Sequence, residues 1–194
     1  MRLVLSTRNP HKVRELGTLL APHEVLPLPE EVELPPETGH TFADNALEKA
    51  RAAARATGLP ALADDSGIEA VALGGAPGVR SARFAGENAS DEENLSKLLR
   101  EVPPDGDRRV AYVCVLAYVS GDEERLFEGR CEGSLATEPR GSGGFGYDPA
   151  FLPADTGDGR TMAELSVEEK DAISHRGRAA RAFLEWLNRE SQAA

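Results

Sequence analysis

Residues 61–67 read Ala-Leu-Ala-Asp64-Asp65-Ser66-Gly67, which places two adjacent carboxylates and a hydroxyl at the end of a short apolar run. The run follows Gly58-Leu59-Pro60 and predicts a buried strand, because short apolar runs bounded by turn residues are typical of strands inside a sheet. Unpaired charge is costly to bury, so the two acids need a cation, either from Lys and Arg side chains or from a metal ion. The nature of that cation decides what this stretch does.

The chain upstream of this run alternates strand and helix signals. Arg2–Ser6 predicts a buried strand, and Asn9 is a predicted cap for the helix that follows. Pro10 lies in the first turn of this helix, where its missing N–H costs nothing. Glu24–Leu28 predicts a second strand, and the Pro-rich segment from Pro27 to Pro36 predicts an extended surface loop.

The rest of the chain continues this alternation. Thr41 begins a long predicted helix with Asp44 as its capping-box partner, and Gly58 ends it. Farther on, the patterns predict a strand over Ile68–Leu73, a helix from Ser90 to about Arg100, paired strands over Arg109–Val119 and Glu124–Gly133, and a helix from Ser174 to about Arg189. This order predicts one α/β domain over residues 1–194, with a central mixed β-sheet flanked by helices.

Composition narrows the class of function. The net charge of −11 argues against binding of duplex nucleic acid through a broad basic face, although a few local cations and a divalent metal can still hold a small polyanion. No apolar stretch reaches the roughly eighteen residues of a membrane span, so we expect no membrane partner. The sequence opens on a strand pattern without a signal peptide, and its two cysteines fit no disulfide framework. We therefore expect a cytoplasmic protein, with Cys114 as a core thiol.

A phosphate site is predicted where the first strand meets the first helix, at Ser6-Thr7-Arg8-Asn9-Pro10-His11-Lys12. Backbone N–H groups at a helix N-terminus, with Lys12 in the first turn, suit a phosphate group. The segment is not a P-loop, because the glycine spacing and the Lys-Ser/Thr pair are absent. The alternative is an ordinary capped helix with a solvated lysine.

Charged pairs on the long helix and on the predicted strand suggest a metal site. Asp44 and Glu48 share one helix face, as do Asn45 and Lys49, although a solvated amphipathic helix explains the same spacing. Mg²⁺ takes oxygen ligands and needs only one or two carboxylates. Adjacent strand residues point to opposite faces, so only one carboxylate of the Asp64-Asp65 pair faces a given site, and the other is expected to anchor a turn. A strand-to-turn junction without metal is the alternative.

Two later segments carry further candidate residues. Gly141-Ser-Gly-Gly-Phe145-Gly146-Tyr147-Asp148-Pro149 combines close backbone approach with aromatic surface that can stack on a base, where a plain Gly-rich turn is the alternative. Lys170-Asp-Ala-Ile-Ser174-His175-Arg176-Gly177 places cations at a predicted helix start, against its dipole. A bound anion would relieve that conflict, whereas the alternative is a solvent-facing His-Arg pair.

Together these segments resemble the inosine triphosphate pyrophosphatase family, also called the Ham1 or RdgB-type non-canonical purine NTP pyrophosphatases. The resemblance runs from Leu5 to about Arg178. Its most specific stretches are Ala63-Asp-Asp-Ser-Gly67, Gly74-Gly-Ala-Pro-Gly-Val-Arg-Ser-Ala-Arg83, Gly143-Gly-Phe-Gly-Tyr-Asp-Pro149 and Ser174-His-Arg-Gly177. It implies a homodimeric enzyme that hydrolyses ITP, dITP and XTP to the monophosphate and pyrophosphate, with two lobes and an active site in the cleft between them.

The resemblance also implies roles for individual residues. Asp65 would be the catalytic carboxylate, as Mg²⁺ ligand or general base, with Asp44 as a second metal ligand, and Phe145 would stack on the base. The implied substrate-binding residues are Thr7, Arg8, Asn9, Pro10, His11, Lys12, Lys49, Ser66, Phe145, Gly146, Tyr147, Asp148, Lys170, His175 and Arg176. Hydrogen-bond donors around the 6-keto oxygen of hypoxanthine or xanthine would be left unpaired by the amino group of adenine.

The chain departs from the family pattern at two positions. Arg8 stands where the family usually has Gly, which exchanges close backbone approach for an added cation. Asp44 stands where the family has Glu and is one methylene shorter, so it would reach a metal through water, or Glu37 or Glu48 would compensate.

Two other functions compete with this prediction. A Maf-like pyrophosphatase would act on other modified or pyrimidine nucleotides with similar lysine and acid chemistry. A nucleotide-binding sensor without turnover would need the Asp64-Asp65 pair to be purely structural.

Overall fold

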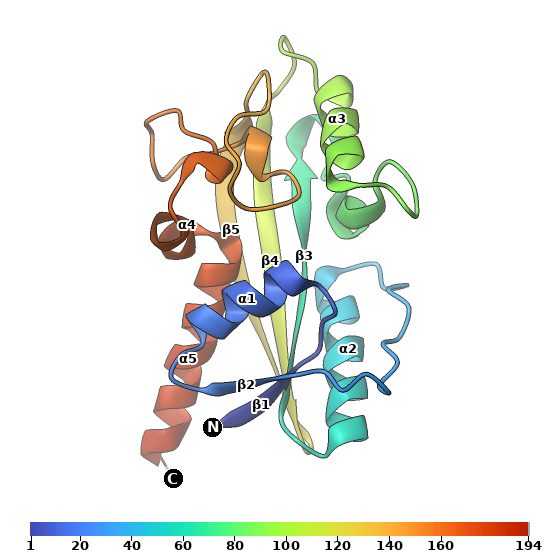
Figure 1. Ribbon diagram of the computed structural model, residues 1–194, viewed down its shortest axis with the longest axis vertical. Helices are drawn as coiled ribbons and strands as arrows, with labels where there is room; N and C mark the ends of the chain where they lie inside the picture. Colours follow the sequence, from blue (N-terminus) through green and yellow to red (C-terminus); the bar gives the residue numbers. More distant parts are fainter. Residues whose placement is uncertain (194) are drawn as a thin grey trace. The chain divides into compact units, whose positions relative to one another are not determined.

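The computed structural model describes residues 1–193, and Ala194, the last residue of the predicted domain, lies outside the described residues. Its strands form one six-stranded sheet in the order β2-β1-β3-β4-β5-β6 (Figure 1). β1 pairs in parallel with β2 and β3, whereas β5 pairs antiparallel with β6, so the predicted mixed sheet is confirmed. The strands are β1 (Arg2–Leu5), β2 (Glu24–Pro27), β3 (Ala61–Ala70), β4 (Arg109–Ser120), β5 (Glu123–Leu135) and β6 (Phe151–Pro153).

The helices begin at the caps that the sequence predicts. The Asn9 side chain accepts hydrogen bonds from two backbone N–H groups of the first turn of α1, and Thr41 and Asp44 form a capping box on α2. Gly58 ends α2 with φ of 67°, a left-handed conformation that favours glycine. The α-helices are α1 (Pro10–Leu19), α2 (Phe42–Thr57), α3 (Asp91–Glu101), α4 (Val167–Ile173) and α5 (His175–Ala193).

The chain divides into two compact units that share the long strands β3, β4 and β5. The first unit holds Met1–Asp65, Cys114–Gly129 and the chain from Arg176 onward, and the second holds Ser66–Val113 and Arg130–His175. The chain therefore passes from one unit to the other between Asp65 and Ser66, and again between His175 and Arg176.

The core of the first unit lies on both faces of its sheet. Leu3 and Leu5 of β1 pack with residues of α1 and α5, including Leu16 and Phe183, whereas Val4 packs on the opposite face with Ala53 of α2. This division follows from the alternation of side chains along a strand. Figure 1 accordingly shows α2 on one side of these strands and α5 on the other. Cys114 is fully buried in this core, as predicted.

The second unit has a core of its own. Ile68 of β3, Tyr112 of β4 and Cys131 of β5 pack with Leu98 of α3 and with Phe151 of β6. Fifteen buried residues make up this cluster, so each unit contains apolar packing of its own.

The structure corrects the prediction of a turn after Asp65. β3 continues without a break from Ala61 to Ala70, so Asp64 and Asp65 lie inside a strand and not at its end. The predicted separate strand over Ile68–Leu73 is the last part of β3 followed by a 3-10 helix at Val71–Leu73. Strand pairing and burial on both sides outweigh the local turn tendency of Asp, Ser and Gly.

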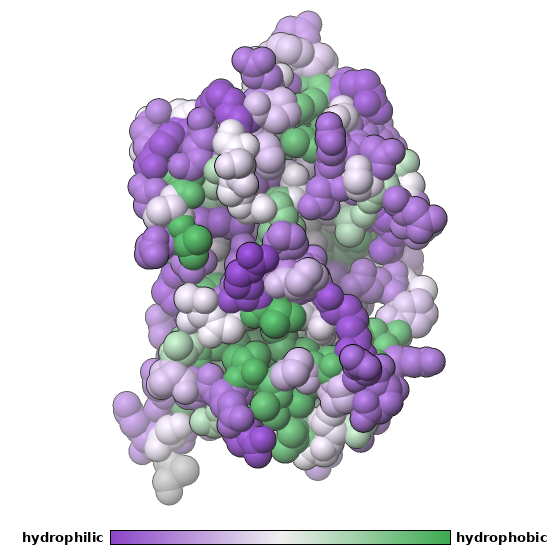
Figure 2. Space-filling model, in the orientation of Figure 1, coloured by the Kyte–Doolittle hydropathy of each residue, from purple (hydrophilic) through white to green (hydrophobic). Residues whose placement is uncertain are grey.

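Charged and polar side chains cover much of the surface in view, and hydrophobic residues gather over the part of the first unit where β1 and β2 run (Figure 2). Across residues 1–193, no helix combines the length and the apolar character needed to cross a membrane.

Candidate active site

Asp64 and Asp65 are neighbours in β3, yet their side chains contact different elements. The partners of Asp64 come from α1, α5 and β4, whereas Asp65 contacts two residues of α2. Successive side chains of a strand point to opposite faces of the sheet, which explains this separation. The two side chains therefore have different surroundings, as the period of a strand predicts.

Asp64 is the centre of a buried ion-pair network. Arg176 Nε donates to its Oδ2 at 2.8 Å, Lys12 pairs with its Oδ1, and the Cys114 thiol donates to Oδ2 at 3.1 Å. Burial by itself would raise the pKa of Asp64, but the charges of Arg176 and Lys12 outweigh it and hold that pKa well below its usual value. Lys and Arg side chains thus supply the cation that this carboxylate needs.

Arg176 is 1% exposed and lies in the first turn of α5, where a cation opposes the helix dipole. Its Nη1 donates to Glu15 Oε2 at 2.6 Å, in addition to the contact with Asp64. Two carboxylates of the protein therefore relieve the conflict for which the sequence suggested a bound anion. The predicted contact of Arg176 with substrate stays a prediction.

Asp65 belongs to a second charged cluster. Lys49 Nζ lies 3.1 Å from Asp65 Oδ1 and 2.6 Å from Glu37 Oε1, and Asn45 Nδ2 donates to Asp65 Oδ2 at 3.1 Å. Burial would lower the pKa of Lys49, but Asp65 and Glu37 outweigh it and raise that pKa. Burial, together with the charge of Glu37, raises the pKa of Asp65 despite the ion pair with Lys49.

The segment that joins β1 to α1 has the helix start that was predicted for a phosphate site. Asn9 accepts from the N–H groups of His11 and Lys12 at 2.9 and 3.4 Å, and Thr7 Oγ1 accepts from the Asn9 N–H at 3.2 Å. The guanidinium of Arg8 instead donates to main-chain carbonyls of the Pro-rich loop. The phosphate contacts predicted for this segment stay predictions.

Three predicted base-site residues meet in the second unit. Lys170 Nζ donates to Asp148 Oδ2 at 2.8 Å and lies 5.1 Å from the centroid of the Phe145 ring. The Phe145 N–H donates to the same Asp148 oxygen at 2.9 Å. A Cβ on Gly144 would clash with Asp148 Oδ2, and the φ of +69° at Gly144 also favours glycine, so the Gly-rich loop packs closely on Asp148.

The neighbouring candidates differ in exposure. Tyr147 is buried in the core of this unit, where its hydroxyl donates to the Ser81 carbonyl at 2.7 Å. The Gly146 N–H donates to Asp91 Oδ2 at 2.8 Å, and Ser66 is half-buried on β3. The side chain of Tyr147 thus supports the loop, and the predicted nucleoside contacts of these residues stay predictions.

A match to a known protein family identifies the family of this chain. The Ham1 family model matches residues 3–186, which include every predicted site residue. This chain belongs to the Ham1 family. The family assignment confirms the resemblance inferred from the motifs.

Individual relatives are similar in sequence to this Ham1 chain over nearly its full length. A dITP/XTP pyrophosphatase of Symbiobacterium thermophilum is 55% identical, covering 96% of this chain and 94% of the relative. A dITP/XTP pyrophosphatase of Photorhabdus laumondii is 49% identical, covering 96% of this chain and 98% of the relative. The Ham1 protein of Coxiella burnetii has a similar structure, with a TM-score of 0.87 and 43% identity over 97% of this chain and 99% of its own.

The donor set around Asp65 fits a divalent cation, as the motifs of this Ham1 chain imply. Asp65 and Glu37 both contact the single ammonium of Lys49, so this cluster brings two carboxylates together beside one lysine. Carboxylate oxygens are the ligands that Mg²⁺ prefers. Within residues 1–193, no three His, Cys, Asp or Glu side chains form a group that could hold a metal ion by themselves.

Asp44, Glu48 and Glu37, the candidates for a second metal ligand beside Asp65, differ in their contacts. The exposed Asp44 carboxylate accepts from the Thr41 N–H at 3.2 Å as part of the cap of α2. Glu48 pairs with Arg51 at 3.0 Å. Glu37 is the one whose contact partner, Lys49, also contacts Asp65. Glu37 directly follows the Pro-rich segment, where the sequence pattern gives little indication of a metal ligand.

Sequence reasoning missed Tyr112. Its ring stacks on the His175 ring, with centroids 4.5 Å apart and an interplanar angle of 8°, and its hydroxyl donates a hydrogen bond to Asp148. Burial and the charge of Asp148 raise the pKa of Tyr112 well above its usual value, so the hydroxyl keeps its proton. A tyrosine in the apolar run of β4 resembles any core aromatic, and no local signal distinguishes it.

Proposed function

We propose that this protein hydrolyses non-canonical purine nucleoside triphosphates, ITP, dITP and XTP, to the monophosphate and pyrophosphate. The observation that carries the proposal is the pair of buried charged clusters in the first unit, in which Lys12 and Arg176 contact the Asp64 carboxylate and Lys49 contacts the Asp65 carboxylate. Relatives about 50% identical over nearly the full chain are dITP/XTP pyrophosphatases, which supports the same substrate class.

The first unit would bind the triphosphate. The backbone N–H groups around Thr7–Lys12 and the ammonium groups of Lys12 and Lys49 would hold phosphate oxygens. Asp65, with Glu37 or with Asp44 through water, would hold Mg²⁺. When bound, this ion neutralises phosphate charge, which matters in a protein whose net charge is −11.

Asp65 would act on the attacking water. Its raised pKa makes it a better proton acceptor than an ordinary aspartate, and Asn45 and Lys49 fix both of its oxygens. As the water oxygen bonds to the α-phosphorus, one of its protons would pass to Asp65, the bond from that phosphorus to the oxygen bridging to the β-phosphate would break, and pyrophosphate would leave with the electron pair. A role for Asp65 as metal ligand alone remains compatible with the same contacts.

The second unit would bind the base. Phe145 would stack on the purine, and Lys170 and His175 would donate hydrogen bonds to its keto oxygen. Lys170 is already held by Asp148, which limits the freedom lost when a base binds.

A substrate panel tests the proposal. ITP, XTP, dITP, ATP, GTP, dTTP and UTP are each incubated with the protein, with and without Mg²⁺, and pyrophosphate and orthophosphate are measured separately. We expect Mg²⁺-dependent pyrophosphate release with preference for ITP, dITP and XTP. Preference for a pyrimidine would support a Maf-like pyrophosphatase, and nucleotide binding without any product would support a sensor.

We also propose one domain over residues 1–194, a homodimer and a cytoplasmic location. The family match over residues 3–186 supports the first, because it spans both units. The other two rest on the family resemblance.

A further inference from the structure

Arg8 clamps the Pro-rich loop through main-chain carbonyls. Its Nη1 donates to the Leu28 carbonyl at 2.7 Å, and its Nη2 lies 2.7 Å from the Pro29 oxygen, 3.3 Å from the Glu30 oxygen and 2.8 Å from the Val32 oxygen. A guanidinium is suited to this role, because it presents five N–H donors in a rigid planar fork. The Arg8 side chain is therefore directed at the loop.

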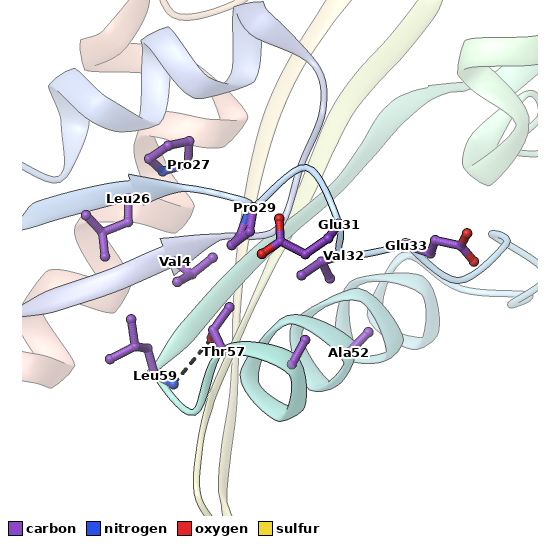
Figure 3. Close-up of a pocket in the computed structure, with 11 residues that line it drawn as sticks. Val4, Leu26, Pro27, Pro29, Glu31, Val32, Glu33, Ala52, Thr57 and Leu59 are labelled. Atoms are coloured by element: carbon purple, nitrogen blue, oxygen red, sulfur yellow. Dashed lines mark hydrogen bonds between the residues drawn. The ribbon is translucent and has the colours of Figure 1, made fainter.

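The same loop has apolar contacts with β1 and α2. Leu28 packs into the small core against Val4 and Ala53. Val32 and Leu34 pack against the same core, beside a hollow of about 560 Å³ that residues of the loop and of α2 line (Figure 3). Figure 3 shows Pro29 and Val32 on the loop side of this hollow.

The far end of the same loop reaches the catalytic candidate. Glu37 contacts Lys49 at 2.6 Å, and Lys49 contacts Asp65 at 3.1 Å. The Gly39 N–H donates to Asn45 Oδ1 at 2.8 Å, and Asn45 Nδ2 donates to Asp65 Oδ2 at 3.1 Å. A Cβ on Gly39 would lie 2.7 Å from Asn45 Oδ1, so this approach is close. The loop is thus fixed at its start by Arg8 and joined at its end to both partners of Asp65.

We propose that Arg8 is a positioning residue: its side chain holds the loop so that Glu37 stays beside Lys49 and Asp65. This inference rests on the proposed hydrolase function of that site. Arg8 is exposed, so water competes for its guanidinium and the expected effect is moderate. The main chain of Arg8 stays part of the proposed phosphate segment, because the clamp uses only the side chain.

Three variants test the inference: Arg8→Ala, Arg8→Lys and, as a matched control, Arg2→Ala, which removes an exposed pair with Glu24 on the neighbouring strand. Hydrogen–deuterium exchange of the backbone amides within residues 28–39, without substrate, measures how firmly the loop is held. The rate of ITP hydrolysis at varied Mg²⁺ concentration measures the effect on the candidate active site. For Arg8→Ala we expect about tenfold faster exchange, about tenfold lower kcat, a higher half-saturating Mg²⁺ concentration and a nearly unchanged KM. Arg8→Lys should resemble Arg8→Ala, because an ammonium cannot reproduce the fork, and Arg2→Ala should match the wild type.

Two results would overturn the inference. Unchanged exchange of the loop in Arg8→Ala and Arg8→Lys would show that Arg8 does not hold it. A raised KM in Arg8→Ala that Arg8→Lys restores would show a direct charge contact with phosphate instead. If the wild type releases no pyrophosphate from any nucleotide, the proposed function fails, and the exchange data still report on the clamp separately.

Discussion

Asp64 and Asp65 are adjacent in β3, and their carboxylates pair with different cations: Lys12 and Arg176 contact the Asp64 carboxylate, whereas Lys49 contacts the Asp65 carboxylate, which also accepts from Asn45. The opposite pKa shifts of the two carboxyls follow from this separation. Asp64 is surrounded by cations and its pKa is lowered, whereas Asp65 shares its cation with Glu37 and its pKa is raised. Substitution of each acid therefore has a different consequence.

Asp64→Asn should lower stability in a pH-dependent way. The folded-state pKa of Asp64 lies below the ordinary value of 3.8, so its ionised form stabilises the fold above that value. This contribution is lost as the pH falls through the folded-state pKa. We expect the free energy of unfolding to fall by about 3–5 kcal/mol near neutral pH, the cost of removing one partner of a buried ion pair, and the deficit to shrink in acid. Urea unfolding across pH measures it, with the exposed Asp105→Asn as control.

Asp65→Asn should remove turnover and spare binding. Loss of the carboxylate removes the proton acceptor, and a general base contributes about 100- to 10,000-fold in rate. We expect kcat for ITP to fall by about 1,000-fold. Calorimetry with a non-hydrolysable α,β-methylene analogue should still detect binding. Retained turnover would favour a structural role for the pair.

Glu37→Gln and Glu48→Gln should separate the candidate metal ligands. Glu37 shares Lys49 with Asp65, whereas Glu48 pairs with Arg51 on the exposed side of α2. For Glu37→Gln we expect the half-saturating Mg²⁺ concentration to rise about 10- to 100-fold, and for Glu48→Gln little change. The reverse order would contradict the assignment of Glu37 to this cluster.

Tyr112→Phe should weaken substrate binding more than chemistry. The substitution keeps the ring that stacks on His175 and removes the hydroxyl that donates to Asp148. Asp148 then holds Lys170 and the Phe145 N–H with one donor fewer, and we expect KM for ITP to rise by up to about tenfold with kcat nearly unchanged. Steady-state kinetics measure both constants. Tyr118→Phe, in the core of the other unit, provides a matched control that should keep the wild-type KM.

The sequence predicts much of the local structure of this protein. Asn9 and Thr41 mark helix starts, and Gly58 marks a helix end, because caps depend on a few residues close in the chain. The motifs also identify the Ham1 family, and the opposite faces of Asp64 and Asp65 follow from the period of a strand. The turn predicted after Asp65 is wrong, because pairing within the sheet outweighed a local preference.

By itself, then, the sequence determines the order of the elements, their caps and the family, since these depend on local patterns or on whole-chain similarity. Only the tertiary structure decides which charges meet. Arg176 reaches Asp64 across 112 positions, Lys49 joins Glu37 to Asp65, and the Arg8 guanidinium donates to the main chain of a loop. Such contacts depend on where the sheet brings distant segments together and on burial that makes each charge require a partner.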